Sequence, residues 1–427
     1  MNMRRCRETI NRSNHMKKCF ISCLLGAAIG VLTLGGLTGC GQEAEEIKPE
    51  KVTLELWYYW DAAATRQRLL TLIREFNETH SDIQIEAICI PDEDFKKTLA
   101  LAIADGTTPD LAIVDSSDVQ YYHNMESLAD VTDCFDQTEY LEQALACSRV
   151  EGDRMVGLPV GVNLLCFYYN MDILEARHVN PPTNLDEFFD AAKKTTSESV
   201  YGCAFPTLQS EETTFDFLPI LWSYGGNLEA IHTESGAKAF DFLRRLSKSG
   251  AMDSSMVNMT ISDIINEFTK GNIAMIFTTS GQEARMRQNN PDLRFAVNAL
   301  PVGENPVTII GGEVLTVMSQ NQKEPSMEFV RFMAEPERIK TYLKDMAALA
   351  PRKDILEWQM SQYPDQRKYM QYINSARTRD FTPYWPAESM AVAGMINQVV
   401  LQEDESDALA KLAEQIRIIQ EEFDEGR

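Results

Sequence analysis

One uncharged, apolar stretch near the start of the chain separates a basic leader from an acid-rich remainder. It runs from Cys19 to Leu37, follows Lys17 and Lys18, and ends in Thr38-Gly39-Cys40. A positive segment, an apolar segment and small residues before a cut are typical of an export signal that is removed from the mature protein. We therefore expect residues 1–40 to be a signal peptide that takes no part in the fold.

The end of this stretch resembles the lipobox of bacterial lipoproteins. The resemblance implies that Cys40 is lipidated on its sulfur, becomes the first mature residue, and anchors the exported protein to the outer face of the cell membrane by acyl chains such as palmitate. A transmembrane anchor is the alternative, because the stretch approaches the roughly 20 apolar residues that span a bilayer. The lipoprotein is favoured because the cysteine stands where the apolar run stops. Translation starts at Met1 or at Met16.

The remainder of the chain is strongly acidic. Residues 41–427 carry 34 Lys+Arg and 63 Asp+Glu, a formal charge of −29. Such a balance argues against nucleic acid as a partner, since phosphates require a basic face, and it favours a soluble monomer. The acid-rich residues 41–50 are expected to form a flexible tether.

Metal and cofactor sites are not expected. Scattered histidines offer no zinc-protease pair, and no two cysteines stand at Cys-x-x-Cys spacing. We therefore interpret the cysteines beyond residue 40 as small buried hydrophobic residues. They are Cys89, Cys134, Cys147, Cys166 and Cys203.

Short β-like runs alternate with helical patterns from residue 52 onward, which indicates α/β layers. Strands joined by crossover helices run parallel and place ligand sites outside their carboxyl ends. Two such ends are residues 57–61 and 115–118. The pattern predicts strands at 52–57, 83–88 and 110–114, with helices at 62–78 and 94–104 between them.

A second α/β block begins near residue 162. A helix is expected to start at Thr183, with Asp186 completing an approximate capping box. Further strands are expected at 164–169, 273–277 and 314–318, and further helices at 234–248, 261–270 and 404–423.

Several short motifs, in order behind the lipobox, resemble one family: the extracellular solute-binding proteins (family 1, sugar-binding lipoproteins) of bacterial ABC importers, the group that includes maltose-binding protein. The similarity covers nearly the whole mature chain. The motifs are Thr108-Pro109-Asp110, Gly157-Leu158-Pro159, Tyr168-Tyr169-Asn170, residues 181–188 and 268–275, Leu300-Pro301, Gly311-Gly312 and Ala350-Pro351-Arg352.

The resemblance implies an α/β, two-lobe periplasmic-binding-protein-like (type II) fold with a hinge and an interlobe cleft. Chain crossings would fall near Gly161, Gly312 and Ala350. The N-terminal lobe would comprise residues 51–161 plus 313–350, and the C-terminal lobe residues 162–312 plus 351–427. The implied function is capture of a carbohydrate, an oligosaccharide, in the cleft and its delivery to ABC permease subunits in the membrane, without catalysis.

Sugars offer apolar C–H faces to aromatic rings and hydroxyls to carboxylates and amides. Trp60 and Asp61 follow the first strand, Asn163 lies at a crossing, and Trp385 precedes a helix where the family often supplies a stacking residue. Because strand residues alternate, one of Tyr58 and Tyr59 should face the core and the other the cleft. The expected ligand-binding residues are Tyr59, Trp60, Asp61, Asp115, Ser116, Asn163, Phe215, Tyr224, Ser280, Gly281, Gly312, Glu313 and Trp385.

Structural roles remain open for several of these residues. Trp60 fits a packed loop, Asn163 a strand-end cap, and Trp385 core packing. Asp118, next to the expected site, fits a helix cap. The loop 278–282 lacks the aromatic residue that the family usually has there, which argues against an extended maltodextrin-like ligand.

Two other functions fit the same residues. An exported glycoside hydrolase would need two carboxylates facing each other across a sugar, and acidic residues are abundant. The same fold could instead bind a polyamine or a metal complex, since carboxylates and aromatic rings also suit a cation.

Overall fold

The computed structural model describes residues 51–59, 63–253, 258–301, 307–318, 321–344, 348–401 and 408–425. The chain divides into two compact units, Met1–Pro49 and Glu50–Arg427, and all described residues belong to the second. The predictions for Cys40, Trp60 and Asp61 lie outside the described residues. Within the described ranges, none of the helices has both the length and the apolar character needed to cross a membrane.

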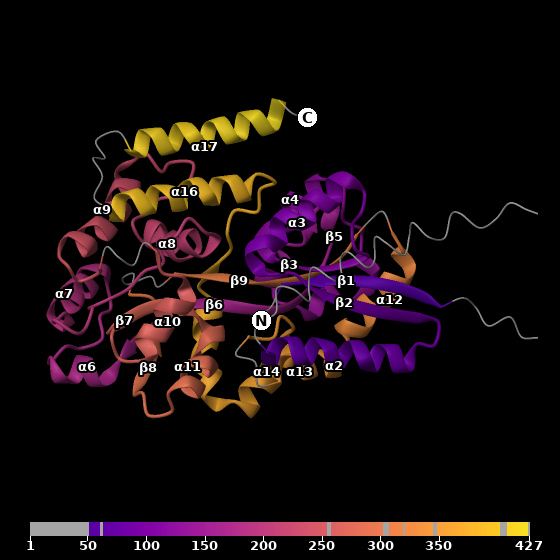
Figure 1. The fold of residues 1–427 in the computed structure, drawn as a ribbon, viewed down its shortest axis with the longest axis horizontal. Coiled ribbons are helices and arrows are strands. Elements are labelled where there is room, and N and C mark those ends of the chain that lie inside the picture. Colours follow the sequence, from indigo (N-terminus) through magenta and orange to yellow (C-terminus); the bar gives the residue numbers. More distant parts are fainter. Residues whose placement is uncertain are drawn as a thin grey trace, which may run out of the picture. The chain divides into compact units, whose positions relative to one another are not determined.

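One sheet runs through the second unit, with strands in the order β2-β1-β3-β9-β6-β7 (Figure 1). The pairs β1–β2 and β1–β3 are parallel, as the sequence predicts, whereas β9 is antiparallel to both β3 and β6. The strands are β1 (Val52–Tyr58), β2 (Ile83–Cys89), β3 (Leu111–Asp115), β6 (Leu158–Asn170), β7 (Met275–Thr279), β8 (Phe295–Asn298), which pairs with β6, β9 (Thr308–Val317) and β10 (Ala376–Arg377), which pairs with β9; β4 (Arg149–Val150) and β5 (Arg154–Met155) form a separate ribbon.

The first half of the unit is built on β1, β2 and β3. Successive side chains at the end of β1 face opposite layers of helices: Tyr58, its last residue, is buried with α2 in one hydrophobic cluster. Tyr59, the next residue, packs against a second cluster that contains Phe95 of α3. The predicted division between the two tyrosines is therefore confirmed for the core residue. The helices of this half are α2 (Ala63–Thr79), α3 (Asp92–Asp105), α4 (Val119–Asn124), α5 (Glu142–Leu145), α12 (Lys323–Ala334) and α13 (Pro336–Leu343).

The second half surrounds β7, β8 and the carboxyl-terminal part of β6. Its helix α7 begins one residue later than predicted: Asn184, rather than Thr183, is the N-cap, and its side chain accepts from the backbone N–H of Glu187 at 2.9 Å. Thr183 instead donates to the Glu187 carboxylate, so the reciprocal bonds are shifted by one position. The helices here are α6 (Met171–Ala176), α7 (Leu185–Thr195), α8 (Glu211–Ser223), α9 (Glu234–Lys248), α10 (Ile261–Thr269), α11 (Glu283–Asn289), α15 (Lys368–Ile373), α16 (Trp385–Val400) and α17 (Ala408–Glu425). Helix α14 (Lys353–Gln362) contacts α13 of the first half.

Strands β6 and β9 pass from one half into the other (Figure 1). Gly161 pairs with Glu313 and Val162 with Gly312, after a register shift between Pro159 and Gly161. Val162 also forms a bridge to Leu349. The three segments predicted to carry the chain crossings thus lie side by side, while the exact residue bounds of the two lobes stay a prediction.

A glycine is required at the centre of this crossing. Gly312 has φ +153°, and a Cβ added there would lie 2.2 Å from the carbonyl oxygen of Gly161. Only a residue without a side chain allows the two backbones to approach so closely.

Two predicted strands were too short, and one was displaced. The strand expected at 164–169 begins at Leu158, the strand expected at 314–318 begins at Thr308, and the strand expected at 273–277 is observed at Met275–Thr279. Proline and glycine residues at the crossing hide the strand pattern in the sequence, but pairing between β6 and β9 holds these residues in extended structure.

The cysteines of the described residues are all free thiols, and four of the five are buried as predicted. Cys134, Cys147, Cys166 and Cys203 are buried, and Cys89 is half-buried. Burial of four of these side chains is consistent with the packing expected of small hydrophobic residues.

Candidate ligand-binding site

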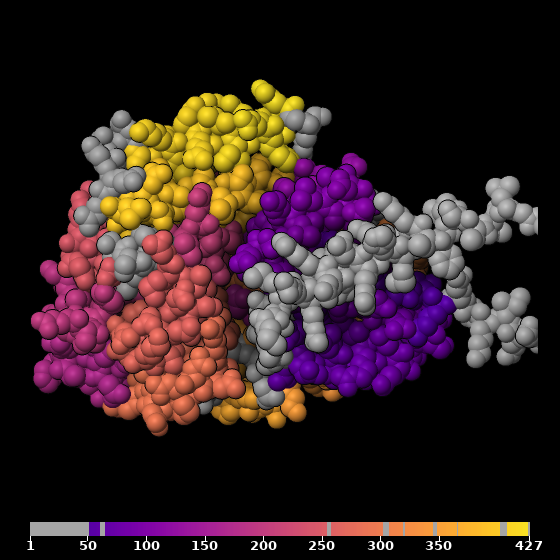
Figure 2. All heavy atoms as spheres, viewed as in Figure 1, coloured from indigo at the N-terminus to yellow at the C-terminus, as the bar shows by residue number. Residues whose placement is uncertain are grey.

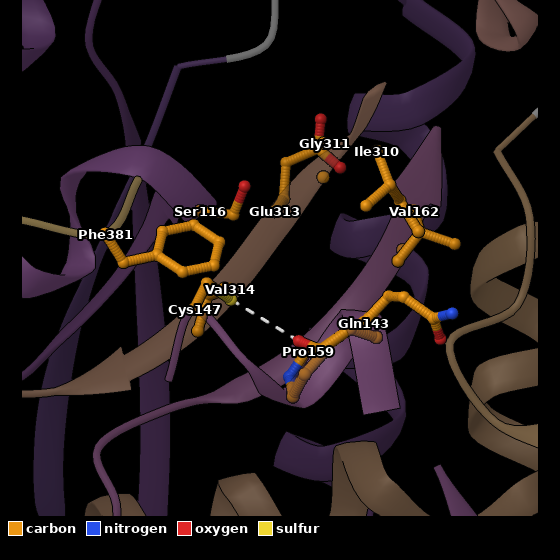
Figure 3. A pocket seen from close by; sticks show the side chains of 13 residues that line it. Ser116, Gln143, Cys147, Pro159, Val162, Ile310, Gly311, Glu313, Val314 and Phe381 are labelled. Carbon is orange, nitrogen blue, oxygen red and sulfur yellow. Dashed lines mark hydrogen bonds between the residues drawn. The ribbon is translucent and has the colours of Figure 1, made fainter. Parts of the chain in front are cut away.

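A small cavity lies at the strand crossing, between residues of both halves. In the space-filling view the indigo to purple part of the first half stands beside the magenta to salmon part of the second (Figure 2). The cavity volume is about 10 Å³, room for about one water molecule. A sugar therefore requires the halves to separate or side chains to move. The cavity is lined by Ser116, Gln143, Ala144, Cys147, Pro159, Gly161, Val162, Ile310, Gly311, Gly312, Glu313, Val314 and Phe381 (Figure 3).

Asp115 and Ser116 reach this site because β3 ends at Asp115 and a turn of 3-10 helix, η1 (Ser116–Asp118), begins there. Asp115 caps this turn: its carboxylate accepts from the backbone N–H of Ser117 at 2.8 Å and from its hydroxyl at 2.7 Å. Asp118 is the N-cap residue of α4, as the sequence suggested, but its side chain does not act as a cap. Asp118 makes no capping hydrogen bond and instead forms an ion pair with Lys96 at 2.8 Å, because the turn brings its side chain back toward α3.

Arg379 joins the two halves at this site, and sequence reasoning missed it. It lies between β10 and α16, and only 2% of its side chain is exposed. One Nη atom bonds Glu211, the first residue of α8, at 2.8 Å. The other lies 3.0 Å from Asp115 and donates to the hydroxyl of Ser116 at 2.8 Å. A charged group buried between two carboxylates is held firmly, since removing either partner leaves a desolvated charge.

The charges at the site shift one another. Burial would raise the pKa of Asp115, but the charge of Arg379 and the hydrogen bonds from Ser117 together hold that pKa below its usual value. Burial also dominates at Asp118 and raises its pKa to about 6, despite the attraction of Lys96. Asp115 is therefore ionised at neutral pH and ready to accept hydrogen bonds.

Several other predicted residues gather around the same point. Gly312 and Glu313 line the cavity. A Cβ added at Gly311 would lie 3.0 Å from the amide oxygen of Asn163 and 3.2 Å from the ring of Phe215, so both side chains converge on the crossing. Asn163 lies within β6 rather than at a strand end, which removes the cap as its role.

Tyr59 belongs to this electrostatic neighbourhood. Burial, followed by the negative charges of Glu313 and Asp115, raises its pKa well above the usual value. Its phenol therefore stays protonated at neutral pH. The ring packs against Phe95 with centroids 5.1 Å apart.

Of the predicted residues that the structure describes, Ser116, Gly312 and Glu313 line the cavity and the other eight do not. Trp385 is fully buried, and its indole N–H donates to Glu211 at 3.1 Å, so it supports the site from the core. Ser280 is buried and accepts from the backbone of Leu164, and Gly281 follows it. Tyr224 follows the last residue of α8, about 20 Å along the helix from Glu211. Whether the predicted residues contact a ligand stays a prediction.

Phe381 is the aromatic ring that lines the cavity (Figure 3). It packs against the hydrophobic cluster of the first half, although it lies on the segment that leads into α16. Neither Phe381 nor Arg379 belongs to a periodic pattern, since the segment between β10 and α16 is irregular. The only sequence signal was their position shortly before Tyr384 and Trp385, where an aromatic contact was expected.

Comparisons with known proteins agree with this architecture. A putative binding protein of Brucella abortus is 23% identical over 79% of this chain and 86% of its own length. A galactooligosaccharide-binding protein of Bacillus subtilis is 21% identical over 79% of this chain and 82% of its own length. Among solved structures, an ABC transporter solute-binding protein of Thermotoga lettingae bound with α-D-tagatose matches with a TM-score of 0.78 and 21% identity, covering 86% of this chain and 100% of that one. These similar structures share the two-lobe fold of solute-binding proteins. The family model of bacterial extracellular solute-binding proteins matches residues 71–369, and the chain belongs to that family.

Proposed function

We propose that this protein captures a carbohydrate in the cleft between its halves and delivers it to the permease of an ABC importer. The observation that carries the proposal is the convergence of sugar-compatible groups from both halves on one point of the strand crossing. Asp115, Ser116 and Glu313 offer oxygen acceptors, Asn163 offers an amide, and Phe381 offers an apolar ring. Relatives that bind sugars support this ligand class.

Ligand capture would work by closure. Contacts made to a sugar by both halves stabilise the closed arrangement over the open one, and binding shifts the population accordingly. Arg379 already links Asp115 of the first half to Glu211 of the second. A sugar that donates hydroxyl protons to these carboxylates would add to the same set of contacts.

A ligand-shift thermal scan tests the binding. Purified mature protein is heated with neutral mono- and oligosaccharides at millimolar concentration, and a bound sugar raises the melting temperature by mass action. We expect Asp115→Asn to weaken the shift about tenfold or more in sugar concentration, because a charge-assisted acceptor is lost. Asp190→Asn, on the exposed face of α7, is the matched control and should keep the full shift. A panel without any stabilising sugar would contradict the proposal.

We further propose that the protein performs no catalysis. Sugar recovered after incubation should be unchanged, and chromatography of the ligand checks this. Release of shorter sugars would instead support the hydrolase, which uses paired carboxylates.

Export and lipid attachment at Cys40 complete the proposal. The sequence around Cys40 supports it, and the described residues begin beyond that point. In a bacterial host, the full chain should partition with the membrane and incorporate labelled palmitate. Cys40→Ser should release the protein from the membrane fraction without changing its thermal stability. Equal membrane association of both variants would contradict the lipid anchor.

A further inference from the structure

The arrangement of charge at the cleft bears on the class of sugar that can enter. We infer that the site takes uncharged, hydroxyl-rich ligands and rejects anionic ones such as sugar acids and sugar phosphates. The inference rests on the proposed carbohydrate-binding function. It is not evident from the sequence, because a buried arginine at a sugar site would ordinarily suggest an anionic partner.

The first argument is the position of the guanidinium. The Arg379 side chain is 2% exposed, whereas the side chains of its partners Asp115 and Glu211 are 37% and 23% exposed. A ligand that enters the cleft would therefore meet the carboxylates, with the arginine behind them. Carboxylates accept hydrogen bonds and cannot donate them when ionised, so they select ligands that bring O–H or N–H donors.

The second argument is that both Nη atoms of Arg379 already bond groups of the protein. Its Nη atoms bond Glu211, Asp115 and Ser116. Nε, a single N–H, has no hydrogen-bond partner among the described residues. A guanidinium has five N–H groups, so one N–H on the Nη atom that bonds Glu211 is also left over. Each of these N–H groups can donate to a neutral hydroxyl. Arginine binds a carboxylate or a phosphate through two parallel N–H groups, and every such pair would need an Nη atom that already bonds the protein.

The third argument concerns the other cation beside the site. The ammonium of Lys96 lies 2.8 Å from Asp118. Burial lowers the pKa of Lys96, but the negative charges of Asp118, Glu211 and Asp115 outweigh it and hold that pKa above its usual value. Further carboxylates surround these pairs. Burial and the charge of Asp92 raise the pKa of Glu212. Burial and the charge of Glu313 likewise raise the pKa of Tyr59.

An anion in this cleft would face more negative than positive charge. It would gain a cation only by breaking an existing buried pair, which leaves a carboxylate desolvated and unpaired. A neutral polyol avoids both penalties and donates its hydroxyls to the exposed carboxylate oxygens. We therefore expect an anionic sugar to bind about 100-fold more weakly than the neutral sugar of the same ring configuration, since like charges placed together are strongly unfavourable.

Isothermal calorimetry on the intact mature protein tests this expectation with matched probes. The pairs are galactose with galacturonate and glucose with glucuronate, at pH 7.5 and low salt. The expected result is binding of at least one neutral member and a loss of about 100-fold for its acid. A uronic acid that binds as tightly as its neutral partner would overturn the inference while the proposed function stands. Failure of every sugar, neutral and acidic, would overturn both.

Two variants locate the effect. Glu211→Gln removes one negative charge beside Arg379 but keeps the shape, so the ratio of neutral to acidic affinity should fall about tenfold. Asp190→Asn removes an equal charge from the exposed surface of α7 and should leave the ratio unchanged. An equal fall in both variants would mean that net charge alone, rather than the cleft, sets the preference, which would contradict the inference. The wild-type ratio remains decisive if Glu211→Gln does not fold.

Discussion

Replacing Gly312 by alanine should be the most damaging single-methyl change at the strand crossing. The residue has φ +153°, which costs an L-amino acid about 1–3 kcal/mol. The added Cβ would lie 2.2 Å from the carbonyl oxygen of Gly161, and 3.0 Å from the Cα of Val162. Backbone atoms cannot rotate away, so relief requires a shift of β6 against β9, at a cost of about 1–3 kcal/mol. The expected destabilisation is about 2–6 kcal/mol.

Thermal unfolding followed by circular dichroism measures this loss. An unfolding entropy of about 2.1 cal/mol/K per residue over roughly 370 residues makes each kcal/mol worth about 1.3 °C, so Tm should fall by about 3–8 °C. Gly161→Ala is the matched control on the facing strand. Its Cβ would meet its nearest neighbours at 3.6 Å, an ordinary contact, and Tm should stay within about 1 °C of wild type. A Gly312→Ala protein that melts with the wild type, or a control that falls equally, would refute this reasoning.

Two further changes test the electrostatics of the site. The pKa of Asp118 in the folded protein is about 6, whereas its ordinary value is 3.8, so ionising this carboxyl destabilises the fold. The loss of stability is about 1–3 kcal/mol; it is absent below about pH 4 and fully present above about pH 6. The Tm of Asp118→Asn should therefore exceed that of the wild type by a growing margin as pH rises from 4 to 7. Lys96, which loses its partner in this variant, is partly exposed and stays hydrated. A difference in Tm that does not change with pH would show that the pKa of Asp118 is not raised. Glu211→Ala leaves Arg379 and the indole of Trp385 without their shared acceptor. It should lower the free energy of unfolding, measured with denaturant, by about 3–5 kcal/mol, and Glu211→Gln should lower it less. Equal stability of wild type and both variants would contradict the proposed network.

The layered α/β order followed from the sequence because its local signals are strong. The helix predicted at 234–248 is observed with those bounds, and the one predicted at 261–270 ends one residue earlier, since both show a clear apolar face. The β-α-β-α-β order of the first half was likewise readable. The family resemblance, rather than periodicity, indicated the crossings.

The site was only partly predictable. Residues at strand ends, such as Asp115 and Ser116, were found because parallel strands direct their carboxyl ends toward ligands. Arg379 and Phe381 were missed because an irregular segment carries no periodic signal, and their role depends on contacts more than 150 residues away in sequence. Trp385 was assigned to the cleft by its position, whereas its burial behind Glu211 depends on the packing of α8 against α16.

The free thiols inside the fold make this protein a practical subject for optical measurement. Burial raises the pKa of Cys147 to about 11 and also raises that of Cys134, so at neutral pH these sulfurs stay protonated and unreactive. Maleimide dyes should then attach to cysteines introduced on the outer helices, with Cys89 as the one half-exposed competitor in the described chain. Cys89→Ser would leave a background on which the distance between a dye on each half reports opening and closing directly.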